Sequence, residues 1–353
     1  MQIYTFFFIK QIICSFFYYL CIKEWVNNFF KMQNMNRERL SYPDICKFIA
    51  VFIVTWSHCA QRVSGMIWTN LWGGFQLDIA FTMPLFMIMS GWFINPDKMR
   101  KVKLQEYVLA KFRRLLIPSF IWYFVLLFFS FTFPDLSLFT YYWYLNALFV
   151  CLCVIMICTK VFRSNIVCCF VSISIILLMP YSDFSHINFM IPFLWAGYGL
   201  RKMLSMKYDS IVIYFCFVIG LCLCLFWSYN YSVYSSPFNS VCLNYEMVII
   251  MIYRFVLGFT LSAVIIYLII RYEKTWICRL AHYGSYSLVI YTSSLACLAL
   301  VSRVLNIFNI HTNMFFVIDI VSLCLCLILI AFSIRFADLC RKNKMLRLLF
   351  LGE

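Results

Sequence analysis

The sequence predicts an all-α, polytopic membrane helix bundle of about ten transmembrane helices. Of its 353 residues 64% are hydrophobic and only 12% are charged, and the mean hydropathy is +0.88. Soluble globular domains carry a charged fraction of about 25%. A chain with this composition and repeated long apolar runs is typical of a multi-pass membrane protein.

Ten apolar segments, separated by charged or turn-forming stretches, are the predicted spans. They cover residues 43–60, 75–95, 115–133, 141–159, 165–180, 187–200, 210–228, 246–270, 283–302 and 314–335. Residues 37–353 are therefore expected to form one transmembrane domain. Residues 1–36 form an apolar extension interrupted by Lys10, Lys23 and Glu24. This extension is either an interfacial helix or lies upstream of a start at Met32 or Met35, and we assign it no function.

The basic residues are distributed unevenly between the two sides of these spans. Of the 29 Lys and Arg, 23 lie in stretches 31–39, 98–114, 160–163, 201–207, 271–279 and 335–347, which alternate spans place on one side. The other side carries only Arg62 and Arg303. Because Lys and Arg accumulate in cytoplasmic loops, we expect a cell (inner, cytoplasmic) membrane protein with both ends of the core in the cytoplasm. The net charge of +15 then indicates no nucleic-acid partner.

The 18 cysteines do not indicate a metal site. They are scattered through apolar runs, where a thiol behaves as a small hydrophobic group. His and Cys do not cluster at the spacing that zinc requires, so no metal is expected.

The first span, residues 41–58 (SYPDICKFIAVFIVTWSH), contains the most informative polar residues. Lys47 and His58 are eleven residues apart, about three turns, so they share one helix face about 16 Å apart. Asp44 and Thr55 lie close to the same face. An ionisable side chain inside a membrane is costly and thus indicates function. We predict His58 and Lys47 as catalytic residues and Asp44 as part of a substrate channel.

Structural interpretations of the same residues remain open. Ser41 and Asp44 have the spacing of a capping box, and Lys47 is near enough to the end of the span to extend to the lipid headgroups. His58 on its own is the kind of histidine that often makes hydrogen bonds inside a protein core.

A second cluster, with seven basic residues in positions 98–114, ends in Lys111, Arg113 and Arg114 at the start of the third span. Such a cluster either sets topology and attracts anionic lipid or binds a phosphorylated cytosolic ligand through charge-assisted hydrogen bonds. Within the later spans, Glu246 and Arg254 lie about two turns apart and are candidates for the substrate channel. Asp78 and Asp319 are also expected to face away from lipid.

Seven segments resemble, in order, motifs of the acyltransferase-3 family of membrane acyltransferases. They are DICKFIAVFIVTWSH (44–58), PLFMIMSGWFI (84–94), KFRRLLIPSFIW (111–122), WYLNAL (143–148), FLWAG (193–197), RFVLG (254–258) and GSYSLVIY (284–291). The resemblance covers residues 37 to about 335. It implies transfer of an acyl group, most often acetyl, from acetyl-CoA or another cytosolic acyl-CoA to a glycan or glycolipid acceptor at the cell surface.

The resemblance also implies roles for individual residues. His58 takes the place of the essential histidine, Lys47 that of the basic residue of the same motif, and Arg114 that of a part of the acyl-CoA end. We predict that Lys111 and Arg113, in the same basic cluster, bind the acyl-CoA together with Arg114. Many members have a second histidine three residues after the tyrosine that corresponds to Tyr291, whereas this chain has Ser294. If some subgroups need that second histidine, this chain belongs to another subgroup or uses a different acceptor.

Two mechanisms and one rival function follow from these residues. His58 would either deprotonate the acceptor hydroxyl as a general base or carry the acyl group as a nucleophile. Alternatively, the chain is a transporter or flippase for a glycan or lipid precursor, with His58 and Lys47 as substrate or proton sites. Membrane lipids are expected partners in each case.

The distribution of basic residues generates a first prediction. A reporter fused after Glu353 should be active if it works in the cytoplasm and inactive if it works only outside, because the last basic stretch, 335–347, keeps the C-terminal end in the cytoplasm. Paired alkaline phosphatase and fluorescent protein fusions measure this. Activity restricted to the outer side would contradict the ten-span arrangement.

Overall fold

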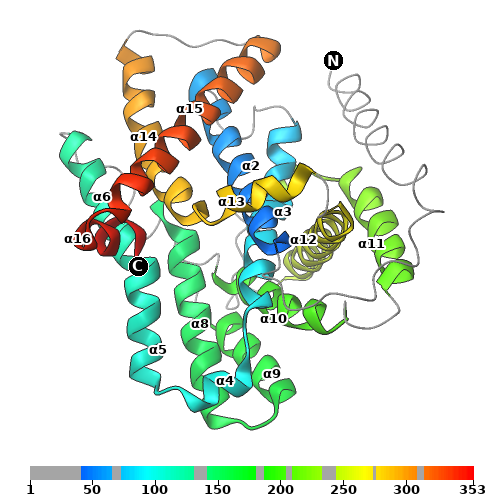
Figure 1. Ribbon diagram of the computed structural model, residues 1–353. Coiled ribbons are helices and arrows are strands. Elements are labelled where there is room, and N and C mark those ends of the chain that lie inside the picture. Colours follow the sequence, from blue (N-terminus) through cyan, green and yellow to red (C-terminus); the bar gives the residue numbers. More distant parts are fainter. Residues whose placement is uncertain are drawn as a thin grey trace.

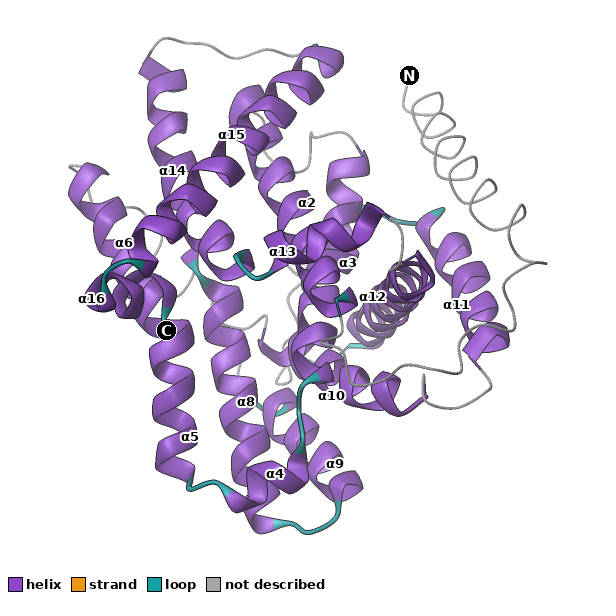
Figure 2. Ribbon diagram, in the orientation of Figure 1, coloured by secondary structure: helices purple, strands orange, loops and turns teal. Residues whose placement is uncertain are grey.

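The computed structural model describes residues 41–65, 73–130, 141–179, 187–203, 209–232, 244–272, 276–307 and 314–353. This part of the chain consists of helices joined by turns and loops (Figure 2). The predicted all-α fold is confirmed. The extension at residues 1–36 lies outside the described residues.

Each predicted span coincides with one principal helix. These are α2 (Tyr42–Ser64), α3 (Gly73–Trp92), α6 (Ile117–Ser130), α8 (Trp143–Val161), α9 (Asn165–Leu177), α10 (Ile187–Met203), α11 (Asp209–Cys224), α12 (Tyr245–Tyr272), α14 (Ser287–Ile307) and α15 (Phe315–Arg341). By length and apolar composition, α8, α12, α14 and α15 qualify as membrane-crossing helices. Asp78–Trp92, Asn165–Leu177 and Ile211–Cys224 are shorter apolar helices.

Short helical elements complete the described chain. They are α4 (Pro96–Lys101), α5 (Leu104–Lys111), the π-helical turn η2 (Phe112–Leu116), the 3-10 turns η3 (Tyr229–Tyr231) and η4 (Trp276–Arg279), α13 (Leu280–Gly284), α16 (Lys344–Leu346) and the π-helical turn η5 (Arg347–Leu351).

Three of these details differ from the sequence prediction. The basic stretch 98–114, which the alternation of spans predicts as a loop after the second span, is largely helical. Asn95 caps α4 by accepting from the Lys98 amide, and charged residues with long side chains are good helix formers. The ninth span begins at Ser287 rather than 283, because α13 is a separate turn packed against α2. The last helix continues to Arg341, beyond the predicted end at 335.

Helix α2 lies at the centre of the bundle and packs against α3, α12, α13, α14 and α15. In Figure 1, α14 and α15 lie on one side of it and α3 and α12 on the other. Ile45, Cys46, Ala50, Val51 and Cys59 on this helix are completely buried. The most polar of the predicted spans is thus enclosed by other helices.

Helices α3 and α10 pack with their backbones in contact. A Cβ atom on Gly91 would collide with the Leu194 carbonyl, and one on Gly197 would collide with the Ile88 carbonyl. Small residues at helix crossings allow this close approach, which is a common packing mode in membranes. The two glycines fix α3 and, through it, one wall beside α2.

Hydrogen bonds between side chains also join the helices. The Trp56 indole donates to the Ser322 hydroxyl at 2.9 Å and links α2 to α15. Ser293 and Ser333 share a hydrogen bond at 2.7 Å between α14 and α15, and the Trp195 indole donates to Ser172 at 2.8 Å between α10 and α9. These bonds satisfy buried polar groups where water is excluded.

Candidate active site

One end of the polar face of α2 contains an ion pair. Lys47 Nζ donates to Asp44 Oδ1 at 3.3 Å, and the same Nζ lies 4.8 Å from the centre of the Phe93 ring. The Lys47 side chain is 25% exposed and that of Asp44 is 15% exposed. Lys47 is therefore held within the protein by a carboxylate and an aromatic face. The backbone of Gly284 in α13 packs directly on the backbone of Asp44.

His58 lies at the other end of this face. Its side chain hydrogen-bonds Gln61, and the Arg62 guanidinium, one turn further along α2, interacts with it electrostatically. Thr55 lies one turn before His58. Thr55, His58 and the pair Gln61 and Arg62 therefore follow one another along one side of the helix. His58 is partly buried. Its imidazole is thus positioned by polar groups from its own helix.

Helix α14 completes the wall next to His58. The Ser294 hydroxyl lies 3.5 Å from that of Thr55, and both residues are buried. Ser294 is the position at which the resemblance to the acyltransferase-3 family leads us to expect a second histidine in many members. The structure therefore places this position one helical turn from His58 along α2.

The tyrosines before α8 close the same region. Tyr141 donates to the Leu295 carbonyl at 2.8 Å, and Tyr142 to the Thr292 carbonyl at 3.0 Å. Arg62 interacts electrostatically with Tyr141 as well as with His58. His58 therefore lies in a polar region built from α2, α14 and the start of α8.

Asp78 provides a carboxyl group near this region. It is 5% exposed, and its side chain hydrogen-bonds Ser57, the residue before His58. The sequence indicated only that Asp78 faces away from lipid. Its proximity to Ser57 arises from the packing of α3 on α2, which the sequence pattern does not reveal.

The predicted donor-binding residues lie on another helical column, formed by α5, η2 and α6. Arg113 and Arg114 are exposed in the π-helical turn η2. Lys111 Nζ lies 5.4 Å from the centre of the Tyr107 ring, and burial together with the nearby Arg114 lowers the pKa of Lys111. Three positive charges are thus close together. Helix α14 packs against both α6 and α2, so it joins this column to the helix of His58.

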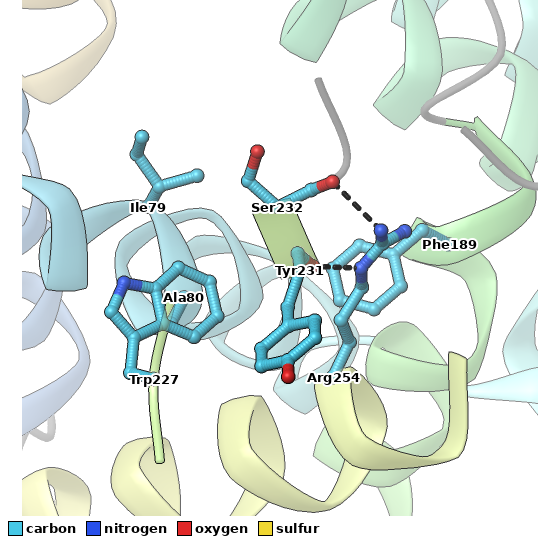
Figure 3. Close-up of a pocket in the computed structure, with 7 residues that line it drawn as sticks. All are labelled: Ile79, Ala80, Phe189, Trp227, Tyr231, Ser232 and Arg254. Carbon is cyan, nitrogen blue, oxygen red and sulfur yellow. Dashed lines mark hydrogen bonds between the residues drawn. The ribbon is translucent and has the colours of Figure 1, made fainter. Parts of the chain in front are cut away.

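Arg254 occupies a pocket of its own (Figure 3). The side chain is 5% exposed; Nε donates to the Tyr231 carbonyl, and Nη2 donates to the Ser232 carbonyl at 2.7 Å. The pocket is small and partly open. It is lined by Arg254 together with Ile79, Ala80, Phe189, Trp227, Tyr231 and Ser232. Glu246 is exposed at the start of α12.

This arrangement separates the predicted residues into three groups. The first group lies on α2 and consists of Asp44, Lys47 and His58. The second lies on α5 and η2 and consists of Lys111, Arg113 and Arg114. Arg254 lines its pocket beside the start of α3, while Glu246 lies outside that lining. Within the part of the chain that the structure describes, no three His, Cys, Asp or Glu side chains are grouped as metal ligands would be.

Comparison with known proteins identifies one family. A family model described as an acyltransferase domain matches residues 40–335. The match includes α2 with His58, η2 with the arginine pair and most of α15. No curated protein and no solved structure matches the chain.

Proposed function

We propose that this chain, which belongs to the acyltransferase-3 family and is a membrane acyltransferase, transfers an acyl group from cytosolic acyl-CoA to a hydroxyl of a cell-surface or exported glycan. Acetyl is the acyl group we expect first, and both ends of the core face the cytoplasm in this proposal. The observation that carries it is the position of His58 on the enclosed polar face of α2, beside the Thr55–Ser294 contact.

The chemical step needs one proton acceptor near a hydroxyl and a thioester. In the proposed reaction His58 takes the proton of the glycan hydroxyl as its oxygen attacks the thioester carbonyl. The carbon–sulfur bond then breaks, and the leaving thiolate takes the proton from His58. The products are an ester and CoA thiol. Gln61, which hydrogen-bonds His58, orients the imidazole.

The donor is expected to bind through its phosphates to Lys111, Arg113 and Arg114. Exposed guanidinium groups bind phosphate oxygens through paired, charge-assisted hydrogen bonds. The acyl-pantetheine arm would then run past α14, which packs on both α6 and α2, and past Lys47. Asp44 holds Lys47 in place for this contact.

The acceptor approaches His58 from the opposite side in this proposal. Arg254 donates hydrogen bonds to the carbonyls of residues 231–232 and thereby holds this segment beside α3. Glu246 is exposed on the same helix as Arg254. The rival transporter function requires no acyl-CoA. Consumption of acyl-CoA by the purified protein, with ester formation on the glycan, distinguishes the two.

The first test of this proposal replaces His58. His58→Ala should lower acyl transfer by about 10²–10⁴-fold, because the proton acceptor is lost. Transfer is measured as ester formation on surface polysaccharide by mass spectrometry and as CoA thiol release by purified protein.

The matched control is His282→Ala, which removes an exposed histidine from α13. It should retain activity. Wild-type transfer by well-expressed His58→Ala would refute the catalytic assignment. An acyl group trapped on His58 in the wild type, but not after His58→Ala, would instead support the nucleophilic mechanism.

Lys47 generates a graded prediction. Lys47→Ala should reduce activity about tenfold to a hundredfold, because Asp44 loses its partner and the donor loses a positive charge. Lys47→Arg should be less severe, since it keeps the charge but changes its shape. Rates from purified variants at equal expression measure the order. Equal loss in both variants would exclude a role based on charge.

The arginine pair generates a further prediction, on donor affinity. Arg113→Ala combined with Arg114→Ala should raise the KM for acyl-CoA about tenfold to a hundredfold. Lys101→Ala combined with Lys103→Ala is the control, because it removes two exposed charges from the same basic stretch. An unchanged KM in the folded double variant would mean that the pair serves topology alone.

A further inference from the structure

The segment after α15, residues 342–353, folds back onto the proposed donor site. It lies beyond the family match, which ends at residue 335. Asn343 accepts hydrogen bonds from the amides of Met345 and Leu346 at 2.8 and 3.4 Å and so starts α16. The following turn, η5, packs against α6, α14, α15 and η2. Figure 1 shows this segment beside α6 and close to the upper end of α5. We call residues 342–353 the strap.

An aromatic cluster anchors the strap. The Phe350 ring lies 5.4 Å from that of Trp122 and 5.1 Å from that of Phe336, with edge-to-face geometry in both pairs. Trp122 and Phe336 are 5.2 Å apart. The next residue, Leu351, is 4% exposed. Aromatic contacts of this kind contribute beyond the area that they bury, so the strap is a packed part of the fold.

Beyond this anchor, the backbone of the strap touches the arginine pair. Gly352 has φ of +68°, which favours glycine. A Cβ atom there would lie 2.6 Å from the Arg114 carbonyl oxygen, 2.7 Å from its Cα and 2.9 Å from the Arg113 carbonyl oxygen. These are backbone atoms, which cannot rotate away. Any larger residue at 352 must separate the strap from η2.

Positive charge accompanies this contact. Lys342, Lys344 and Arg347 are exposed on the strap, whereas its one acidic side chain is that of Glu353. The Arg347 carbonyl accepts from the Glu353 amide at 3.4 Å, which places Arg347 one π-helical turn from the contact with Arg114. Two basic segments from distant parts of the sequence therefore meet at one place.

We propose that the strap is a positioning element of the donor site: it fixes η2 so that Arg113 and Arg114 present their guanidinium groups together, and Lys344 and Arg347 add charge for the same phosphates. This inference rests on the proposed function, because it takes acyl-CoA as the ligand of the arginine pair. Phosphate monoesters and diesters of the nucleotide and anionic lipid headgroups share the chemistry that such a site binds.

The test uses the full chain with Gly352→Ala and, separately, Phe350→Ala. The first removes the close contact with Arg114 and the second removes the aromatic anchor. Each should raise the KM for acyl-CoA about five- to tenfold and weaken binding of labelled CoA by the same factor, with kcat within about twofold. Gly199→Ala is the matched control, because a Cβ atom at Gly199 meets no atom within 4 Å.

The lipid environment distinguishes the two phosphate sources. The measurements are made in neutral phosphatidylcholine nanodiscs and repeated with added phosphatidylglycerol. An effect present in neutral lipid supports the strap as part of the donor site. An effect that appears only with phosphatidylglycerol would overturn the inference and assign the strap to lipid headgroups.

Comparison with the arginine variants separates failure of the inference from failure of the proposed function. A raised KM after Arg113→Ala with Arg114→Ala, but unchanged CoA binding in both folded strap variants, overturns the strap alone. Unchanged binding in all of these variants overturns the donor site as well. If Gly352→Ala does not fold, Phe350→Leu weakens the anchor more mildly and should give a smaller shift in the same direction.

Discussion

The ion pair and hydroxyl groups along α2 cannot face lipid without a large cost, and this constraint organises the bundle. Other helices therefore surround α2: α13 covers its first turn, α14 and α15 contact its length, and α3 and α12 pack opposite. Each polar group on the enclosed face finds a partner within the protein, such as Asp44 for Lys47 and Ser294 for Thr55. The same enclosure surrounds the region of His58 with protein, as the proposed transfer between two polar substrates would require.

Helix α14 connects the region around His58 with the proposed donor site. Its three successive hydroxyl residues, 292–294, are buried and bonded in different directions: Thr292 to its own helix, Ser293 to α15 and Ser294 to α2. Small hydroxyl side chains can form hydrogen bonds with their own helix or with an adjacent one. Helices that carry them can therefore approach closely without leaving buried polar groups unpaired. On its other flank α14 packs against α6 and η5. The wall beside His58 is therefore continuous with the elements that hold the arginine pair.

The helices could be predicted because the hydropathy of a short stretch of sequence is enough to indicate a membrane span. Every predicted span coincides with a helix, since about 20 apolar residues in a bilayer have few alternatives to helical structure. The separate turn α13 was missed because it depends on the contact between Gly284 and the backbone of Asp44. The site was predictable only along one helix. Lys47 and His58 share α2 by spacing, whereas Ser294, Tyr141 and Asp78 reach the same region through packing between segments far apart in sequence.

The strap shows why local sequence patterns alone do not define the proposed donor site. A basic tail after the last span is what cytoplasmic topology requires, so its charges in the sequence suggest no further role. Its apolar residues carry the additional information. Phe350 packs against Trp122 and Phe336, Leu351 is buried, and the chain then needs a residue without Cβ to pass the backbone of Arg114. A tail that only set topology would not need this fit. Two neighbouring guanidinium groups repel each other, and backbone contact with a second segment is a physical means of holding them together for a phosphate ligand.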